Sequence, residues 1–418
     1  MGFLSNEAFE VMRIRNFRLF LIYRFCITAA ILMQSVIVGW QLYSITKDML
    51  SLGLIGLTEV IPQVSIALFA GHYVDIWDRK RIIFHTTFLL LIGSGLLLAT
   101  AIPEIHLGFL STTTPIFITV FLVGLVRGIL MPAHTALLGQ LVPRELLARA
   151  VTWGSSVWQV AAITGPALGG LVYGFFGLME AYIMVFVFFL ICTTLIFFIK
   201  SPGRVVAESK PEDTIFTRIR EGIRYVFRNQ LLLGAFALDM FAVLFGGAVA
   251  MLPVFASDVL MVGPEGLGIL RACPAAGAIV MSILLTFKPP VYRSGFLMMW
   301  SVAGFGICMI VFALSKNFYL SGVCLLLSGV FDSVSVVVRS SILQLFTSNE
   351  MKGRVASVNS IFVGSSNELG AFESGVAASL MGLIPSVVFG GMMTLIVVAV
   401  AAKVAPTLRK LSLRDAYA

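Results

Sequence analysis

The sequence predicts an all-α integral membrane protein whose twelve transmembrane helices form two six-helix bundles related by a pseudo-twofold axis. Three observations lead to this fold class: the composition, the length of the apolar stretches, and a repeat between the two halves. Of the 418 residues, 59% are hydrophobic and only 12% are charged, about half the ~25% typical of soluble domains. Such a chain has too few polar side chains to cover a water-facing surface. The composition therefore argues against a soluble enzyme or a nucleic-acid-binding protein.

A helix needs about 20 mostly apolar residues to cross the hydrocarbon core of a bilayer. Twelve stretches meet this length, and they lie at residues 20–45, 52–73, 82–101, 114–138, 147–173, 178–199, 231–255, 266–287, 294–314, 319–346, 355–381 and 385–402. A polar connection, residues 201–230, separates an N-terminal bundle, residues 1–200, from a C-terminal bundle with a short tail, residues 231–418. Apolar residues recur at helical spacing in the connection, which predicts an amphipathic helix on the membrane surface. These residues are Ile215, Ile219, Ile223 and Phe227.

The positions of lysine and arginine predict the orientation in the membrane, because short cytoplasmic loops are enriched in both. Of the 29 such residues, Lys47 and Lys316 lie in the loops of one side, and four arginines lie inside spans. All the others lie in the opposite loops and at the two termini, so both termini are expected in the cytoplasm. The charge of +8 is then explained by anionic headgroups, and no nucleic-acid partner is expected.

Two segments of the chain resemble each other. The first runs from the end of the fourth stretch through the fifth, and the second runs from the end of the tenth stretch through the eleventh. The segment 140–177 reads QLVPRELLARAVTWGSSVWQVAAITGPALGGLVYGFFG, and 344–382 reads QLFTSNEMKGRVASVNSIFVGSSNELGAFESGVAASLMG. With one extra residue in the second loop, four positions coincide: Arg149 with Arg354, Gly165 with Gly370, Gly170 with Gly375, and Gly177 with Gly382. A parallel repeat of two six-span bundles is the plan of a transporter whose halves rock about a central site.

Between the second and third stretches the chain reads GHYVDIWDRKR, residues 71–81. A glycine turn, an acid and a basic cluster at this place resemble the loop signature of the major facilitator superfamily. The resemblance implies the fold of that superfamily and a conformational latch against neighbouring helix ends, formed by Gly71, Asp75, Arg79 and Lys80. Ile76 and Asp78 depart from the family pattern, so a weaker latch is expected.

A second resemblance points to a branch of that superfamily. GPALGG at 165–170 resembles the end of the motif that marks its drug:proton antiporters, with Gly165, Pro166, Gly169 and Gly170 matching. The alternative is plain helix packing, because glycines at this spacing let another helix approach closely. FRLFLIYRF at 17–25, Arg127 with Gly128, and MKGRVASVN at 351–359 make the chain resemble the branch that holds the enterobactin exporter and macrolide efflux pumps.

Ionisable residues inside apolar stretches are candidates for function, because each costs about 3 kcal/mol to insert. They are Arg24, Glu59, Arg127, Asp239, Arg271, Asp332, Arg339, Glu368 and Glu373. The family topology implies that Arg127 and Asp332 lie near mid-depth of the central cavity. Asp332 is the first choice for proton coupling, since protonation would weaken its pairing with Arg127. A static ion pair between the two helices is the alternative.

The other ionisable residues have more open roles. Arg339 follows Asp332 by seven residues, which places it on nearly the same helix face as a second cavity charge partner. Asp239 and Glu368 are further proton-coupling candidates. Glu373 points about 140° away from Glu368, and either of the two could instead be a packing partner. Interfacial or structural roles are expected for three residues near the membrane boundaries, Arg24, Glu59 and Arg271.

The sequence thus predicts a multi-pass inner (plasma) membrane transporter that exports an amphipathic drug-like or siderophore-like molecule by proton antiport and alternating access. An importer or a lysolipid flippase of the same fold, or a membrane sensor that does not transport, is the alternative. Small-molecule substrate, protons and the lipid bilayer are the expected partners, and a monomer is expected to suffice. No phosphate-binding loop or nucleophile–base set appears, so neither an enzyme nor a cofactor is expected. Separate histidines and unpaired cysteines argue against a metal site or disulfides.

Overall fold

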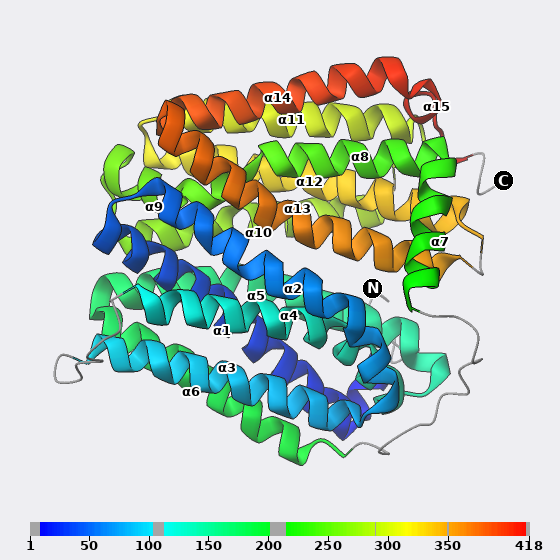
Figure 1. Ribbon diagram of the computed structural model, residues 1–418. Helices are drawn as coiled ribbons and strands as arrows, with labels where there is room; N and C mark the ends of the chain where they lie inside the picture. The colour runs from blue at the N-terminus through cyan, green and yellow to red at the C-terminus, as the bar shows by residue number, and fades with distance from the viewer. Residues whose placement is uncertain (1–8, 103–112, 201–214, 289, 349–350, 415–418) are drawn as a thin grey trace, which may run out of the picture. The chain divides into compact units, whose positions relative to one another are not determined.

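The computed structural model describes residues 9–102, 113–200, 215–288, 290–348 and 351–414. All regular structure in these ranges is helical (Figure 1). The helices of the first half are α1 (Arg15–Thr46), α2 (Met49–Ile76), α3 (Arg79–Ala101), α4 (Thr114–Leu141), α5 (Leu147–Phe176) and α6 (Leu178–Phe198). Those that follow are α7 (Ile215–Arg228), α8 (Gln230–Phe245), α9 (Leu252–Val254), α10 (Pro264–Phe287), α11 (Ser294–Leu314), α12 (Phe318–Phe346), α13 (Lys352–Met381), α14 (Leu383–Val404) and α15 (Pro406–Arg409).

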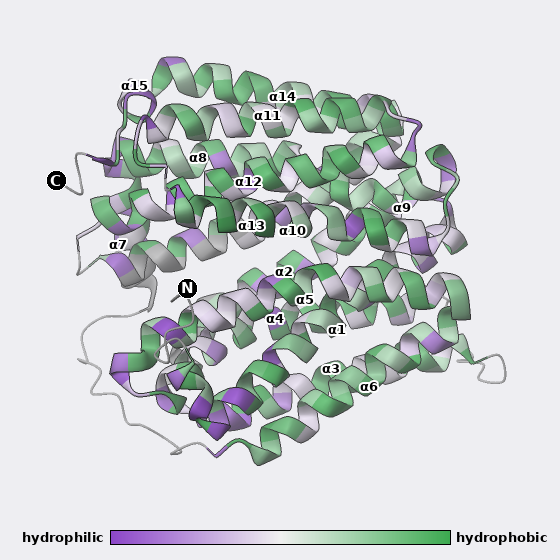
Figure 2. Cartoon of the chain, turned by 180° about the vertical axis from the view of Figure 1, so that it is seen from behind, coloured by the Kyte–Doolittle hydropathy of each residue, from purple (hydrophilic) through white to green (hydrophobic). Residues whose placement is uncertain are grey.

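Eleven helices in the described ranges are long and apolar enough to cross a membrane, which confirms the all-α membrane class. Figure 2 shows these long helices coloured as hydrophobic along most of their length. Helix α13 is 30 residues long but is not among the eleven. It carries Lys352, Arg354, Glu368 and Glu373, and the count of twelve spans therefore stays a prediction.

Contacts divide the chain into two compact units. Unit 1 comprises Met1–Leu42, Ile61–Lys210 and Pro264–Gly268, and unit 2 comprises Tyr43–Val60, Pro211–Gly263 and Ile269–Ala418. Within unit 1, α3 packs against α4 and α6, and within unit 2, α11 packs against α12 and α14. Each unit thus consists mainly of one half of the chain and takes a short segment from the other half. The predicted bundle boundaries at residues 200 and 231 stay predictions.

Local sequence signals explain where several helices begin and end. The side chains of Asp78, Asn229 and Asn317 each accept hydrogen bonds from two backbone N–H groups in the first turns of α3, α8 and α12. Such residues are preferred there because those N–H groups lack helical partners. Gly177 and Gly382 end α5 and α13 with φ of 109° and 89°, a conformation that favours glycine. They are equivalent positions in the predicted repeat.

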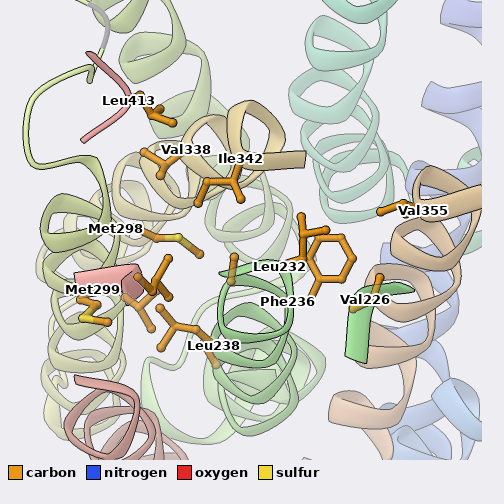
Figure 3. Packing of buried hydrophobic residues seen from close by; sticks show 14 of the residues in the cluster. Val226, Leu232, Phe236, Leu238, Met298, Met299, Val338, Ile342, Val355 and Leu413 are labelled. Carbon is orange, nitrogen blue, oxygen red and sulfur yellow. The ribbon is translucent and has the colours of Figure 1, made fainter. Parts of the chain in front are cut away.

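A buried apolar cluster forms the core of one end of unit 2. It joins Val226 of α7, Leu232 and Phe236 of α8, Met298 of α11 and Leu413 of the C-terminal tail (Figure 3). Each of these side chains is at most 5% exposed. The cluster therefore fixes α7 and the tail to the helices of unit 2.

The predicted span at 231–255 is confirmed as a segment long and apolar enough to cross a membrane, since Gln230–Val259 is among the eleven, but it is not one regular helix. Helix α8 ends at Phe245, and the chain continues as a 3-10 turn at Gly247–Met251, as α9, and as a π-helical turn at Phe255–Val259. Gly246 and Gly247 weaken the helix, and Pro253 lacks the N–H that a regular helix requires there. The sequence contained these signals, but the apolar composition masked them.

The predicted amphipathic helix in the connection is present as α7. Its Val226 is 3% exposed and belongs to the core cluster of unit 2, whereas Ile223 and Phe227 are exposed. The side chains of Ile215 and Ile219 lie outside the part of the chain that the structure describes. The exposed apolar pair is available for a membrane surface, and contact with such a surface stays a prediction.

Candidate functional site

An ion pair joins Asp239 of α8 to Arg339 of α12 inside unit 2. The Asp239 and Arg339 side chains are only 6% and 7% exposed, and Leu238 and Ala242 beside the aspartate are buried too. A buried charge is strongly unfavourable unless an opposite charge is held against it. The pair therefore specifies where α8 and α12 meet. Sequence reasoning named both residues but did not pair them.

Asp332 precedes Arg339 by two helical turns and is half-buried. Beside it, the Ser333 hydroxyl oxygen lies 3.0 Å from that of Ser282 on α10, so α10 and α12 share a polar contact here. Arg127 belongs to unit 1 and Asp332 to unit 2, and their predicted pair stays a prediction. The sequence suggested Arg127 and Arg339 as charge partners of Asp332. Arg339 forms its ion pair with Asp239 instead.

A second charged group in unit 2 surrounds Arg271 of α10. Its guanidinium interacts electrostatically with the carboxylate of Glu368 on α13 and, more weakly, with that of Glu59 on α2. One of its nitrogens also donates a hydrogen bond to the Val249 carbonyl oxygen at 2.9 Å. Val249 lies in the irregular turns after α8. The group thus connects α2, α10, α13 and the broken segment. An interfacial role for Glu59, which the sequence suggested, stays a prediction.

Close packing of α2 on α13 positions these carboxylates. A Cβ atom on Gly56 would lie 2.5 Å from the Glu368 carbonyl oxygen, and one on Gly375 would lie 2.5 Å from the Gly53 Cα. Only glycine fits at such distances, because a backbone atom cannot move aside. The result is that Glu59, one turn beyond Gly56, is brought to the level of Glu368.

Two further ionisable candidates are Glu373 of unit 2 and Arg127 of unit 1. Glu373 is half-buried on α13 and receives a hydrogen bond from its neighbour Ser374. Arg127 is half-buried on α4, directly before Gly128, where the helix packs within van der Waals contact of Gln63 and Ile66 of α2. The structure thus gives Glu368, and not Glu373, an electrostatic interaction with Arg271.

A buried polar network in unit 1 was missed by sequence reasoning. The Tyr23 hydroxyl of α1 lies 3.1 Å from the Thr87 hydroxyl of α3 and 3.0 Å from Nε2 of His134 on α4. All three side chains are buried. Sequence reasoning had judged the histidines only as metal ligands, although a histidine in an apolar span already signals a hydrogen-bonded site. No three His, Cys, Asp or Glu side chains gather as metal ligands in the described ranges.

Arg24 follows Tyr23 on α1 and belongs to the surroundings of this network. Its charge acts on both Tyr23 and His134, and its buried Nε atom has no hydrogen-bond partner among the described residues. The arginine is half-buried. An anchoring role at the membrane interface, which the sequence suggested, stays a prediction.

The loop motif lies at the junction of α2 and α3. Gly71 and Asp75 fall in the last turns of α2, and the Asp75 side chain lies outside the part of the chain that the structure describes. Asp78 caps α3, and Lys80 Nζ donates to the Phe197 carbonyl oxygen at the end of α6 at 3.1 Å. Asp78 thus has a structural function that its departure from the family pattern concealed.

The GPALGG segment of α5 is a packing surface in unit 1. A Cβ on Gly165 would lie 2.7 Å from the Ala29 carbonyl oxygen of α1, and one on Gly169 would lie 2.8 Å from Met33. A Cβ on Gly170 would lie 2.5 Å from the Cα of Gly268, in the first turn of α10. The predicted close helix approach is confirmed, and a bearing on transport direction stays a prediction.

The Gly170–Gly268 contact has a counterpart in Gly375–Gly53. Gly170 and Gly375 coincide in the predicted repeat, and Gly268 and Gly53 each occupy the fifth position of their helices. The same small-residue contact therefore occurs once in each unit. This correspondence supports the internal repeat at the level of single residues.

Comparison with known proteins agrees with the fold. A family model described as transmembrane secretion effector matches residues 6–416. Macrolide efflux protein A of Streptococcus pyogenes is 22% identical, covering 93% of this chain and 95% of that protein. The enterobactin exporter EntS of Escherichia coli is 26% identical over 81% of this chain and 79% of the exporter.

Other matches are shorter or structural. The chain spans about half the length of two MFS-type transporters of Bacillus subtilis, YfiS and YkuC, matching 46% and 45% of them. A bacterial homologue of the human lysosomal transporter Spinster, solved in an inward-facing state, superposes with a TM-score of 0.69. It is 15% identical and covers 98% of both chains, which shows a shared fold. The chain therefore belongs to the transmembrane secretion effector family of the major facilitator superfamily.

Proposed function

We propose that this transporter exports an amphipathic small molecule from the cytoplasm in exchange for protons, by alternating access in the inner membrane. Relatives named as a macrolide efflux protein and an enterobactin exporter support the outward direction and the substrate class. The distribution of lysine and arginine supports cytoplasmic termini. GPALGG, by its resemblance to the antiporter motif, supports exchange with protons.

The buried pair Asp239–Arg339 is the observation that carries the proposal. While Asp239 is ionised, each charge offsets the unfavourable burial of the other. A proton on Asp239 would leave Arg339 buried without a counter-charge, so the proton-loaded state favours an arrangement in which water or another acid reaches Arg339. Proton binding and a change of helix packing are then linked.

The break after α8 lets that change occur near the pair. Gly246 follows Asp239 by about two helical turns. Beyond it the chain forms a tight 3-10 turn, the short helix α9 and a wide π-helical turn. Interruptions of this kind are frequent where transmembrane helices bend or bind a substrate. Helix α8 is thus able to tilt about Gly246 without disrupting a continuous hydrogen-bond ladder.

Other residues have subordinate roles in this proposal. Asp332 and Glu368 are further proton-coupling acids, with Arg127 as the counter-charge of Asp332. Gly71, Asp75, Arg79 and Lys80 form the latch between conformations. The four GPALGG residues provide the close α5 contact about which packing changes.

The test uses inside-out membrane vesicles that carry the transporter and are energised to an acidic interior. Macrolides, catecholate siderophores and cationic dyes are added singly, while substrate uptake and dissipation of the proton gradient are recorded together. We expect coupled uptake of one class by the wild type. In Asp239→Asn, gradient-driven uptake should be lost while substrate exchange without a gradient remains.

Glu10→Gln is the matched control. Glu10 also forms an ion pair, with Arg149 at 3.0 Å, but both side chains are substantially exposed. Removing that pair should leave coupled uptake unchanged. Full gradient-driven uptake in Asp239→Asn would reject the role of Asp239. Uptake by the wild type without proton movement would instead indicate facilitated or lipid transport.

A further inference from the structure

A basic cavity lies in unit 2 and shares no lining residue with the two charged groups described above. It has a volume of about 450 Å³ and is lined by Arg293, Phe296, Arg409 and Lys410. Three of these four residues are cations, and none is an acid. No carboxylate in the described part of the chain forms an ion pair with them. Three like charges around one cavity repel each other, and a bound anion would relieve that repulsion.

The walls of the cavity are fixed by hydrogen bonds that the C-terminal tail forms with the first turn of α11 and with the loop before it. The backbone N–H of Gly295 donates to the Leu411 carbonyl oxygen at 3.2 Å, and that of Arg414 donates to the Val291 carbonyl oxygen at 3.0 Å. The Leu413 N–H donates to the Ser294 hydroxyl at 3.3 Å. Arg409 and Lys410 are thus held opposite Arg293 and do not belong to a loose tail.

Packing beneath the cavity strengthens this arrangement. Leu408, directly before Arg409, is fully buried, and Leu413 is 2% exposed in the core cluster (Figure 3). Gly295 approaches the Leu408 carbonyl so closely that no Cβ fits there. Arg293 adopts a left-handed backbone, with φ of 48°, which is unfavourable for a non-glycine residue. The surrounding contacts maintain this conformation.

The face of α11 next to the cavity is apolar and exposed. Phe296, which lines the cavity, is 46% exposed, and Trp300, one turn further along α11, is 60% exposed. Their rings are in edge-to-face contact at 6.0 Å. Ile307 continues the same exposed face. In a membrane-spanning helix such a face meets lipid chains, and tryptophan there is typical of the interface with the headgroups.

We propose that the cavity formed by Arg293, Arg409 and Lys410 binds the phosphate of an anionic phospholipid, whose acyl chains lie along Phe296 and Trp300. Cations alone would accept any phosphate, but the adjoining apolar face matches a molecule with an attached hydrocarbon chain. Basic pockets of this kind beside membrane spans recognise anionic headgroups. By the predicted orientation this lipid belongs to the cytoplasmic leaflet. The site does not depend on the transported substrate or on protons.

The test measures quenching of Trp300 fluorescence by brominated lipid in phosphatidylcholine nanodiscs that contain the full-length protein. Brominated phosphatidylglycerol and brominated phosphatidylcholine are compared at equal mole fraction. The signal of Trp300→Phe is subtracted, so that only quenching at Trp300 remains. We expect preferential quenching by phosphatidylglycerol. In Arg409→Gln/Lys410→Gln, the apparent affinity for that lipid should fall about tenfold or more.

Arg220→Gln/Arg224→Gln is the matched control, because it removes two exposed arginines from α7 and changes the net charge equally. Its preference for phosphatidylglycerol should be retained. Equal quenching by both lipids would overturn the proposal, because the site would then not distinguish an anionic headgroup. An equal loss in this control would overturn it in favour of general electrostatic attraction. Displacement of the brominated lipid by millimolar inorganic phosphate would overturn it in favour of a soluble phosphate site.

Discussion

Asp239 and Arg339, 100 positions apart in the chain, form a buried ion pair between α8 and α12. A pair of this kind is strongly destabilising when one partner is removed, because the other charge is left buried. It is often close to neutral when both partners are replaced by apolar residues of similar size. This asymmetry separates the contribution of the pair to folding from its proposed contribution to transport.

Removing one charge should destabilise the protein more than removing both. Asp239→Leu is expected to lower the free energy of unfolding by about 3 kcal/mol or more, and Asp239→Leu/Arg339→Met should recover most of that loss. Thermal unfolding in one detergent measures both variants. The double variant should fold well and yet fail to couple uptake to protons. A double variant as unstable as the single one would contradict the analysis of this pair.

The acid that acts beside Arg271 should be Glu368 and not Glu373. Glu368→Gln removes the carboxylate with the largest electrostatic effect on Arg271, so we expect reduced gradient-driven uptake together with lower thermal stability. Glu373→Gln, five residues further on the same helix, is the matched control and should preserve uptake. Inside-out vesicles with a pH-sensitive dye give the measurement. Loss of coupling only in Glu373→Gln would reverse the assignment.

The sequence was most informative where a signal is local. Apolar length predicted the membrane helices, and the glycines of GPALGG predicted a close helix contact. Asp78, directly before the first turn of α3, was also a readable N-cap signal, but its departure from a family motif drew the interpretation elsewhere. Gly246, Gly247 and Pro253 likewise signalled a break that the apolar composition obscured.

Partners distant in the chain were beyond the reach of sequence reasoning. A charge in an apolar span implies that some partner exists, because an isolated buried charge is so unfavourable. Which acid meets Arg339 depends on how α8 and α12 pack, and no local pattern encodes this. The same applies to His134 and Tyr23, which lie 111 positions apart and meet through the packing of α1 against α4.

The hydroxyl of Tyr23 should stabilise unit 1 through its two buried contacts. Tyr23→Phe leaves the Thr87 hydroxyl and the His134 ring without this partner, and we expect a loss of about 1–3 kcal/mol in the free energy of unfolding. Tyr319→Phe is the matched control, because Tyr319 is 80% exposed and its change should be near zero. Thermal unfolding measures both. Equal effects of the two substitutions would show that the network contributes little.

The capping of α2 by Asp48 should depend on pH. Its carboxylate accepts hydrogen bonds from the Ser51 hydroxyl at 2.7 Å and from the N–H groups of Leu50 and Ser51. These bonds, that of the hydroxyl foremost, hold the pKa of Asp48 below its usual value. A lowered pKa in the folded state means that the stabilisation is complete above about pH 5 and is lost as the pH falls through that pKa.

Asp48→Asn tests this dependence, since asparagine also caps helices but does not titrate there. The difference in melting temperature between wild type and Asp48→Asn should be constant from pH 8 to pH 5 and should change only below about pH 4. It should stay small, corresponding to less than about 1 kcal/mol, because the group is partly exposed. A difference that varies near neutral pH would show that another group is responsible.

The equivalent contacts Gly375–Gly53 and Gly170–Gly268 should respond alike to an added methyl group. In Gly375→Ala the new Cβ would lie 2.5 Å from the Gly53 Cα, and because backbone atoms cannot yield, we expect a loss of about 1–3 kcal/mol. Gly170→Ala should cost a similar amount. Gly139→Ala is the control, because nothing lies within 4 Å of its added Cβ and alanine favours a helix by up to about 1 kcal/mol. Thermal unfolding should thus show two decreases and one small increase, and a tolerated Gly375→Ala would mean that the repeat does not extend to this contact.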